Sequence, residues 1–536
     1  MNTCRSTLCL LLFIPLFSFC TQQEPLSDRL SVDPLGVLEL DETRLLVTEV
    51  ASDLDAAWNV EWGPDGWIWI TEHAGRVSRV HPETREFQPL LTIEDVWHER
   101  SRGLMSLVFH PEFDENGWLY VHYVWSPDEE TFFGRIERYR WDGDSLVEPT
   151  SILDDLPGNT GHNGARMMVG PDNLLWVGTG EALRADLAQD PFTDHGKVLR
   201  MNWDGTPAEG NPYPGHRTWS TGHRNIQGIT YGRGEIYAAE HGPDNDDEVN
   251  HIRPAANFGW PDVHGYCDSD AERDYCRDSL VVEPMVAFTP VIAAAALEYY
   301  DHEAIPEWRH SLLLSSLRIQ ALRALDLNEA GDEIDQIHIY FQQVWGRIRD
   351  LDVTPDGRVL LATSNLDWYY DYRPELVTDE QIARGDRILM LEPLTPELES
   401  RLGDLSTIRV LREEAEALYH GDEEVDETAE RGQQLYTAHC GSCHGSNAEG
   451  MGAIAPGLSG SSYLTGESGP LIEVVLHGSE AIDREGPATY EWAMPAFSTL
   501  DDDEIATILT FLRNRYTDQD DPIPASEVGE YRENNP

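Results

Sequence analysis

The sequence predicts an all-β, six-bladed propeller followed by a small all-α domain. Before residue 365, a turn of the Pro-Asp-Gly kind followed by a short apolar strand recurs six times, at spacings of about 45–75 residues. Helical periodicity is almost absent before about residue 395 and is present near the C-terminus. The recurring units are residues 63–70, 110–121, 170–177, 231–238, 306–314 and 354–361.

Each unit joins a hairpin turn to a strand that is expected to be buried. In the first unit, Gly63-Pro64-Asp65-Gly66 favours a turn, and the apolar run Trp67–Ile70 follows it. A generic β-sandwich is the alternative, but the regular return of one unit makes it less favourable. Six blades over residues 40–393 would leave an axial channel, and ligands bind at its mouth, where loops from different blades converge.

The character of the chain changes after residue 393. Residues 394–425 are rich in Glu, Leu and Arg, and we expect an acidic helical linker there. Residues 426–518 form the expected all-α domain, which closes with a helix that begins with acidic residues near Asp501. Residues 519–536 are acidic and contain proline, which predicts a disordered tail.

The N-terminus is typical of an export signal. Residues 1–20 contain one arginine and then an apolar run from Leu8 to Phe19, which is too short for a stable membrane span. Cys20 offers a lipid-attachment site, although such signals favour a small residue where Phe19 stands. Simple cleavage and lipid attachment both remain open. Either one predicts a periplasmic or exported protein, and the second anchors it to a bacterial membrane.

The chain is strongly acidic. It has 97 Asp and Glu residues against 38 Lys and Arg, a formal net charge of −59 and a pI of about 4.4. Lys197 is its only lysine. Such a charge disfavours nucleic acid and anionic lipid surfaces as partners. Because the acidic residues are spread along the chain, we favour adaptation to a salty environment over solubility alone as their explanation.

The motif Cys440-Gly441-Ser442-Cys443-His444 has the C-x-x-C-H form of a c-type haem attachment site. The thiols of Cys440 and Cys443 would bind one porphyrin covalently, and His444 would be an axial ligand of the iron. Met494 is the expected second axial ligand; Met451 is its rival but lies too close to His444 in the sequence. A zinc half-site would need a second ligand pair, which the neighbouring sequence lacks. Residues 430–516 resemble a class I cytochrome c domain, which implies electron transfer.

Two cysteines remain outside the N-terminal segment and the haem motif. These are Cys267 and Cys276. In an oxidising compartment they are expected to form a local disulfide that closes a small loop.

Polar residues gather in four loops of the predicted propeller. Arg347 and Arg349 stand two residues apart on a strand, so their side chains point the same way and suit a polyanionic ligand. Salt bridges to the many carboxylates of this chain are the alternative. Gly242-Pro243 offers backbone carbonyls that suit a hard cation such as calcium. His162 lies between small residues before a blade strand, where a lone histidine is more often structural than catalytic.

Residues 45–393 resemble the soluble glucose and aldose sugar dehydrogenases that depend on pyrroloquinoline quinone (PQQ), a six-bladed propeller family. The resemblance is carried by Arg224-Asn225-Ile226-Gln227-Gly228, Glu240-His241-Gly242-Pro243, Asp246–Asn250, Asn257–Pro261, Arg347–Asp350 and Gly103–Phe113. It implies that His162 is the catalytic base. It also implies that PQQ is bound by Arg224, Asn225, Arg318, Arg347 and Arg349, and that the carbonyls of Gly242 and Pro243 bind calcium. The glucose enzymes carry a lysine at the position of Arg318, and the two side chains differ in geometry.

Other positions depart from that family. Ser101 replaces a glutamine, Gly161 replaces the aspartate beside the histidine, and Val286 and Thr289 fall where aromatic residues cover the substrate. The cofactor site is therefore better matched than the sugar site.

The combined prediction is a dehydrogenase that depends on PQQ and calcium. It would oxidise an aldose sugar or a related alcohol or aldehyde and pass the electrons to its own haem, and from there to a respiratory acceptor. The alternatives are a calcium-dependent hydrolase of the lactonase kind and a non-catalytic binding propeller. The hydrolase would explain neither the paired arginines nor the attached cytochrome, whereas the departures at Ser101 and Gly161 leave the binding propeller open.

Overall fold

The computed structural model of the chain describes most of the propeller and parts of the C-terminal domain. The described residues are 34–243, 245–289, 291–367, 385–402, 409–412, 431–432, 435–436, 439–444, 448, 455–458, 461–466, 468–478, 494–498, 500–517 and 522–534. The expected export signal, Met451 and most of the linker lie outside these ranges. None of the helices among the described residues is long and apolar enough to cross a membrane.

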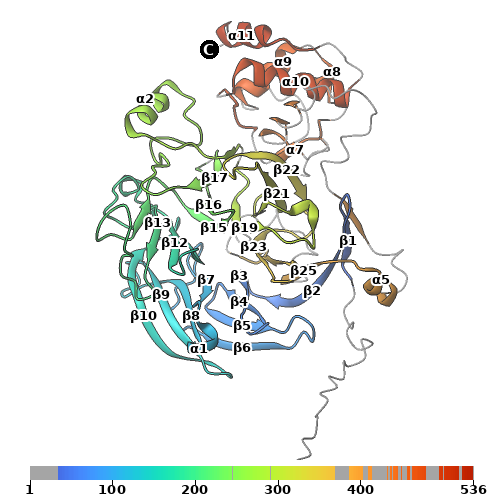
Figure 1. The fold of residues 1–536 in the computed structure, drawn as a ribbon. Helices are drawn as coiled ribbons and strands as arrows, with labels where there is room; N and C mark the ends of the chain where they lie inside the picture. Colours follow the sequence, from blue (N-terminus) through green and yellow to red (C-terminus); the bar gives the residue numbers. More distant parts are fainter. Residues whose placement is uncertain are drawn as a thin grey trace, which may run out of the picture.

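Six antiparallel blades form the N-terminal domain and confirm the predicted propeller (Figure 1). The first is β3 (Ala57–Trp62), β4 (Ile68–Glu72), β5 (Arg76–Val80) and β6 (Phe87–Thr92). The second is β7 (Leu104–Phe109), β8 (Trp118–Trp125), β9 (Phe133–Trp141) and β10 (Leu146–Pro157). The third is β11 (Gly164–Val169), β12 (Leu175–Thr179), β13 (Val198–Met201) and β14 (Thr218–Ser220).

The remaining blades close the ring. The fourth is β15 (Ile226–Gly232), β16 (Glu235–Glu240), β17 (Asp247–Ile252) and β18 (Val286–Phe288). The fifth is β19 (Ala294–Tyr300), β20 (Ser311–Ser316), β21 (Ala321–Leu327) and β22 (Ile334–Tyr340). The sixth joins β23 (Ile348–Val353), β24 (Val359–Thr363) and β25 (Asp386–Pro393) to β2 (Arg44–Leu54), so an N-terminal strand completes the last blade.

Each recurring sequence unit ends within the second strand of a blade, which is β4, β8, β12, β16, β20 or β24. A repeated side-chain contact explains part of the pattern. The indole N–H of Trp69 donates to Asp65, 3.1 Å away, and that of Trp176 donates to Asp172 at the same distance. The turn aspartate thus fixes a tryptophan four residues later, on the strand that enters the core.

The linker is only partly helical. Helix α5 (Pro396–Leu402) follows the propeller, but residues of β26 (Val410–Arg412) then pair in parallel with β1 (Gly36–Glu39). Strand β1 pairs in turn with β2, so the sixth sheet has six strands. The linker backbone thereby covers what would otherwise be an open sheet edge.

Among the described residues of the propeller, two short helices interrupt the blades, α1 (Phe113–Asn116) and α2 (Asp270–Ser279), with 3₁₀ turns at Ala185–Leu187 and Pro306–Trp308. A capping box between Ser269 and Glu272 begins α2. The predicted disulfide between Cys267 and Cys276 is confirmed, with the two Cα atoms 6.4 Å apart. It ties the loop before α2 to the helix itself.

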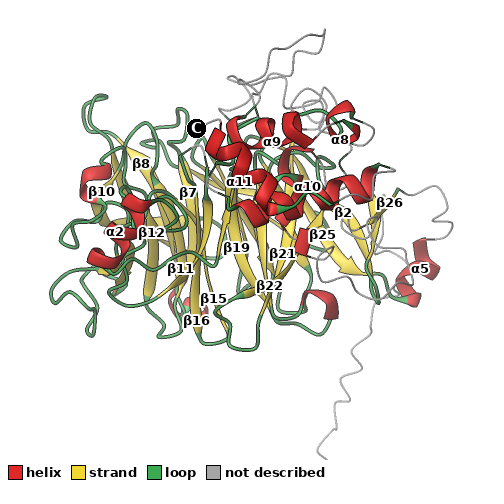
Figure 2. Ribbon diagram, turned by 90° about the horizontal axis from the view of Figure 1, so that it is seen from above, coloured by secondary structure: helices red, strands yellow, loops and turns green. Residues whose placement is uncertain are grey.

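The C-terminal domain is helical, as predicted. Figure 2 shows helices gathered in these segments and strands filling the propeller. The described helices are α7 (Gly441–His444), α8 (Ser462–Thr465), α9 (Ser468–His477), α10 (Asp502–Tyr516) and α11 (Ala525–Asn534). Asp501 caps α10 through Glu504, as its acidic start suggested. Apolar side chains of α10 are buried in one core with those of α9; on α10 they include Ile505, Ile508, Leu509 and Leu512.

The prediction of a disordered tail was wrong for residues 525–534, which form α11. Val528 is fully buried against the core of the domain. The Tyr531 hydroxyl donates to Glu473 on α9 at 2.9 Å, and Arg532 pairs with Asp502 on α10 at 3.0 Å. Acidic composition suggested disorder, but one buried valine and these polar contacts hold the segment on its neighbours.

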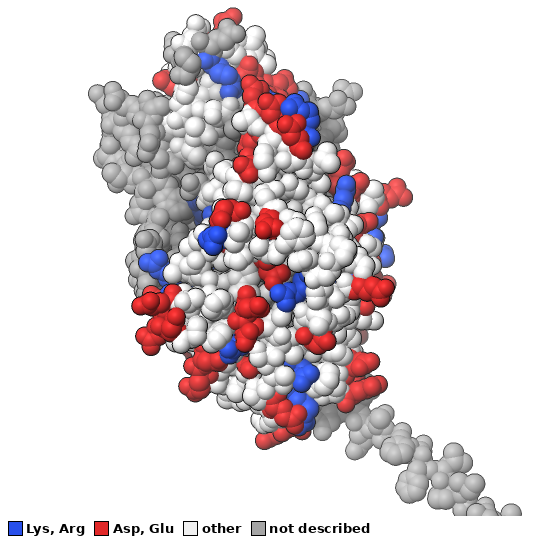
Figure 3. Space-filling view, turned by 90° about the vertical axis from the view of Figure 1, so that its left-hand side faces the viewer, with Lys and Arg blue, Asp and Glu red and all other residues white. Residues whose placement is uncertain are grey.

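The surface reflects the composition. On the face shown in Figure 3, acidic side chains outnumber basic ones and are dispersed over the propeller and the C-terminal helices. Many of the exposed arginines pair with a carboxylate, as Arg140 does with Glu148 and Arg309 with Asp301.

Candidate functional site

A cavity of about 600 Å³ opens where the six innermost strands begin. Every blade, or the loop that leads into it, contributes to its wall, as expected for the mouth of a propeller channel. All eight residues that the sequence assigned to this site line the cavity: His162, Arg224, Asn225, Gly242, Pro243, Arg318, Arg347 and Arg349.

His162 lies in a constrained loop at the cavity wall. Its backbone is left-handed, with φ of 55°, and a Cβ on Gly180 would lie 1.9 Å from its carbonyl oxygen. The side-chain Nδ1 lies 2.6 Å from a carboxylate oxygen of Glu181, which is 2 % exposed. Because a carboxylate accepts, this bond places the proton on Nδ1 and leaves Nε2 as the basic atom.

The loop of His162 is fixed from two sides. The amide N–H of Gly164 donates to Asn225 at 3.0 Å, and the side-chain amide of Asn163 donates to the carbonyl of Ser101 at 3.1 Å. The Ser101 hydroxyl donates to the carbonyl of Thr160 at 3.2 Å. A histidine on so short and tightly bonded a loop is held in one place before any ligand arrives.

A second wall of the cavity carries two arginines held by one carboxylate. Arg347 and Arg349 donate to the same oxygen of Asp367 at 2.9 and 2.8 Å. Burial raises the pKa of Asp367, but the two guanidinium groups outweigh it and lower this pKa overall. Burial lowers the pKa of Arg349 to about 10, so it stays charged at neutral pH. Its guanidinium lies 3.9 Å from the ring centre of Trp58, which also lines the cavity.

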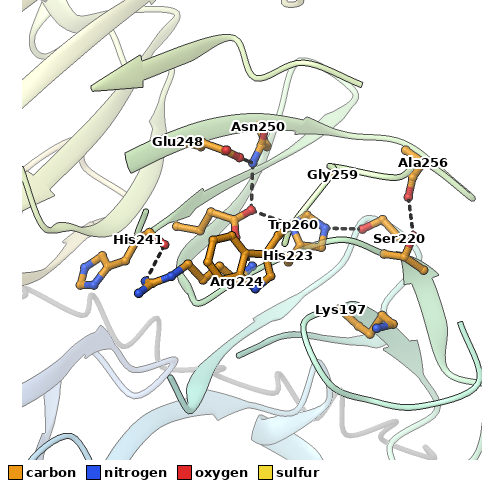
Figure 4. Close-up of polar contacts among 12 residues, drawn as sticks. Lys197, Ser220, His223, Arg224, His241, Glu248, Asn250, Ala256, Gly259 and Trp260 are labelled. Atoms are coloured by element: carbon orange, nitrogen blue, oxygen red, sulfur yellow. Dashed lines mark hydrogen bonds and ion pairs between the residues drawn. The ribbon is translucent and has the colours of Figure 1, made fainter. Parts of the chain in front are cut away.

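Arg224 is positioned by a buried network on the fourth blade (Figure 4). Glu240 accepts from the backbone N–H of Arg224 at 2.6 Å and lies 2.7 Å from Nδ1 of His223. The other ring nitrogen of His223 lies 2.8 Å from the Ser220 hydroxyl. The guanidinium of Arg224 donates to the carbonyl of His241 and lies 5.1 Å from the ring of Trp260. Ser220, His223 and Glu240 are buried, and the bond from Glu240 holds the backbone of Arg224 in place.

The Gly242-Pro243 segment is held by a buried aspartate. The N–H of Gly242 donates to Asp247 at 2.9 Å, and the same carboxylate accepts from Ala294 at 3.1 Å. A Cβ on Gly242 would lie 1.9 Å from the carbonyl oxygen of Asn245, so the close turn requires glycine. Burial raises the pKa of Asp247 to about 6.

The chemistry of the cavity fits a polyanionic, partly aromatic ligand such as PQQ. Five of its lining residues are arginines and one is a carboxylic acid. Nε of Arg349 and Nε2 of His241 are buried in this wall and have no hydrogen-bond partner among the described residues. Burial, reinforced by Arg224 and Arg349, lowers the pKa of His241 to about 3, so its ring is neutral. Buried polar atoms are almost always hydrogen-bonded, and these two belong to residues that line the cavity, so a bound ligand or water would satisfy them.

The haem residues belong to the C-terminal domain. His444 is 7 % exposed and its Nδ1 lies 2.9 Å from the carbonyl of Pro456, which leaves Nε2 for a metal. Burial lowers the pKa of His444 and favours the neutral ring, which is the form in which an imidazole can bind a metal. Cys440 forms no disulfide, and it packs with Met494 against the helical core. The side chain of Cys443 lies outside the described residues.

Comparison with known proteins decides the family. The family model described as glucose/sorbosone dehydrogenase matches residues 54–368, and the cytochrome c model matches residues 429–515. The chain belongs to the glucose/sorbosone dehydrogenase family. It carries a cytochrome c domain after the dehydrogenase propeller.

Individual relatives agree with this assignment. Quinoprotein glucose dehydrogenase B of Acinetobacter calcoaceticus is 32 % identical over 403 residues, covering 59 % of this chain and 84 % of the relative. The PQQ-bound aldose sugar dehydrogenase of Streptomyces coelicolor is 27 % identical, with a TM-score of 0.56 over 65 % of this chain and 98 % of that one. A glucose dehydrogenase-like oxidoreductase of Thermus thermophilus is 31 % identical, with a TM-score of 0.55, covering 65 % and 99 %.

The structure adds residues that the sequence had not singled out in this dehydrogenase. Glu181 and Asp367 come from other loops of the propeller and reach His162 and the arginine pair. Glu181 closely follows β12, and a polar residue at a strand end near the channel is the signal that could have revealed it. Neither Val286 nor Thr289 lines the cavity, where Val291 and Ala293 lie instead.

Replacement of Glu181 by glutamine should slow the chemical step about ten- to hundredfold. The amide oxygen of the new side chain could still accept from Nδ1 of His162, but the negative charge that stabilises the protonated ring would be gone. This rate would be measured by loading the enzyme with PQQ, mixing it rapidly with sugar and following the reduction of the haem. Glu181→Leu also removes the hydrogen bond that orients the His162 ring, so the chemical step should be slower still in this variant. Equal rates for the wild type and both variants would contradict a positioning role for Glu181.

Proposed function

We propose that the chain is a PQQ- and calcium-dependent sugar dehydrogenase that delivers electrons to its own c-type haem. The observation that carries this proposal is the cavity in which a carboxylate-paired histidine faces several arginines within a dehydrogenase-family propeller. The attached cytochrome c domain supports an electron acceptor in the same chain.

His162 would begin the reaction as a general base. Its Nε2 would take the proton of the substrate hydroxyl on the carbon to be oxidised, and Glu181 would stabilise the positive charge that develops on the ring. The same carbon loses a hydride, so the hydroxyl-bearing carbon becomes a carbonyl or, from a hemiacetal, a lactone. When bound, PQQ supplies the two-electron oxidant for this step.

The chain's own groups would hold the cofactor and its cation. Arg318, Arg347 and Arg349 would pair with the cofactor carboxylates through charge-assisted hydrogen bonds, and Arg224 and Asn225 would contact the quinone. Backbone carbonyls of Gly242 and Pro243 would bind calcium, a ligand type that this hard ion prefers. Asp247 would keep that segment in place.

A c-type haem would be held covalently by Cys440 and Cys443 and bound at its iron by His444 and Met494, and it would supply a one-electron acceptor in the same chain. A soluble or membrane-bound respiratory carrier would receive the electrons. The haem motif and the N-terminal apolar segment support an exported, periplasmic location, because c-type haem is attached outside the cytoplasm. The proposal includes two fates of the N-terminal segment, which are simple cleavage and lipid anchoring at Cys20.

Reconstitution tests this function. Haem-containing protein purified without PQQ should show haem reduction on addition of a reducing sugar only when both PQQ and calcium are present. Chelation of calcium should abolish the response, and renewed addition should restore it. PQQ binding is followed separately by its absorbance. The proposal would be contradicted if the protein bound PQQ but none of the aldoses, uronic acids and aldehydes tested caused haem reduction. Hydrolysis of lactones by the same protein would then favour the hydrolase alternative.

A further inference from the structure

Arg100 occupies a tight turn at the rim of the cavity. Glu99 and Arg102 exchange two backbone hydrogen bonds of 3.2 Å, which leaves Arg100 and Ser101 as the two residues of a hairpin turn. Arg100 has φ of 58°, whereas Ser101 does not have a positive φ. A turn of this geometry is the one in which glycine is preferred at the first position. An arginine at this first position has an unfavourable, left-handed backbone conformation. Backbone strain of this kind is concentrated at functional sites.

The turn is anchored on both sides of Arg100. Arg102 is 3 % exposed, pairs with Glu99 at 2.6 Å and lies 4.2 Å from the ring centre of Phe132. Ser101 is bonded to Thr160 and Asn163, the residues that flank the His162 loop. The backbone of Arg100 is therefore fixed relative to the catalytic histidine, while its own side chain is exposed and lines the cavity.

Arg100 differs from the other arginines of the cavity. Within the described part of the chain it makes no hydrogen bond and no ion pair, although the protein has 97 acidic residues. Arg318, Arg347 and Arg349 enter from the fifth and sixth blades, whereas Arg100 enters from the loop before the second blade, beside His162. Arg100 therefore carries a positive charge near His162, apart from the wall that holds the other three arginines. A charge in this position is placed to contact the substrate.

We propose that Arg100 binds an anionic group of the substrate, so that this dehydrogenase oxidises acidic sugars in preference to neutral ones. This inference rests on the proposed function. The substrate would be a reducing sugar with a carboxylate or sulfate ester at the end remote from the anomeric carbon. The guanidinium would pair with that anion through charge-assisted hydrogen bonds while His162 acts at the anomeric hydroxyl. The small residues Ser101 and Gly161 leave room on this side of the cavity.

Matched substrates test the proposal with the haem- and PQQ-loaded enzyme. The pairs are glucuronate with glucose and galacturonate with galactose, and glucose 6-sulfate separates a sulfate ester from a carboxylate. We expect kcat/KM for the acidic sugar to exceed that for its neutral parent about tenfold or more. Arg100→Gln should lower kcat/KM for the acidic sugar about tenfold more than for the neutral one. Arg277→Gln removes the same charge from an exposed site on α2 and should leave the preference unchanged.

Two further measurements keep the test decisive. Arg100→Gly should retain or raise the thermal midpoint, because glycine suits the turn, and should lose the acidic preference as Arg100→Gln does. Calorimetry with methyl β-glucuronide and methyl β-glucoside, which have no free anomeric hydroxyl, measures binding without turnover. Tighter binding of the glucuronide by the wild type and its loss in both variants would support the anion-binding role of Arg100 independently of the oxidation rates.

Three other results would contradict either the proposal for Arg100 or the function on which it rests. Equal kcat/KM for acidic and neutral sugars, or equal binding of the two glycosides, would exclude an anion-binding role for Arg100 and leave the dehydrogenase function intact. If Arg100→Gln slowed haem reduction equally with both kinds of sugar, the residue would act in a step common to all substrates, which contradicts the proposal. Absence of oxidation with every sugar, despite bound PQQ, would instead contradict the proposed function.

Discussion

Replacement of His162 by alanine is expected to lower sugar-dependent haem reduction about a thousandfold or more. The alanine leaves no base within the loop, and Glu181 cannot substitute for it because that carboxylate is 2 % exposed behind the ring. Haem content and the absorption spectrum of the haem should stay unchanged, since His162 belongs to the propeller. The rate is measured by rapid mixing of the PQQ-loaded enzyme with saturating sugar.

A matched histidine variant is the control for this experiment. His216 lies in a loop of the third blade and packs on Phe192, 4.9 Å between ring centres, outside the lining of the cavity. His216→Ala should reduce haem at the wild-type rate. If His162→Ala retained full activity with PQQ bound, His162 would not be the base, and the proton would have to be taken by another group of the cavity.

The propeller could be predicted from the sequence because its information is local and repeated. Asp65 and Trp69, or Asp172 and Trp176, are four residues apart and produce the same turn and strand contact in different blades. The haem motif is local as well. In each case, the residues that define the feature are near one another in the chain, so spacing alone reveals them.

Other parts of the site depend on contacts between distant segments. Asp367 reaches Arg347 from twenty positions away, and Asn225 holds Gly164 across sixty-one positions. No pattern in the sequence shows that these pairs meet, because the contact arises only when the chain has folded into packed blades. The same is true of α11, which is stabilised by contacts with two other helices. The strained backbone of Arg100 likewise appears only once the turn has formed.

Removal of both haem-attaching thiols should allow the two steps of the proposed electron path, sugar oxidation and haem reduction, to be measured apart from each other. In the double variant Cys440→Ala, Cys443→Ala, we expect no haem to remain bound after acid precipitation, because no thioether bond can form. Sugar oxidation would then be detected only through an added dye that accepts electrons from the propeller. The measurements are haem absorption of the denatured protein and, separately, sugar-dependent reduction of the dye.

The variant Cys267→Ala, Cys276→Ala is the control for the loss of two thiols. It opens a disulfide that spans nine positions, which is expected to cost about 2–3 kcal/mol of stability, but it should retain covalent haem and sugar-dependent haem reduction. If the Cys440, Cys443 variant lost dye reduction as well, the propeller would depend on the haem domain for more than an electron outlet. If it still held haem covalently, the attachment assigned to Cys440 and Cys443 would be wrong. Dye reduction without haem would show that the sugar is oxidised in the propeller and that the haem acts after this step, which is the order that we propose.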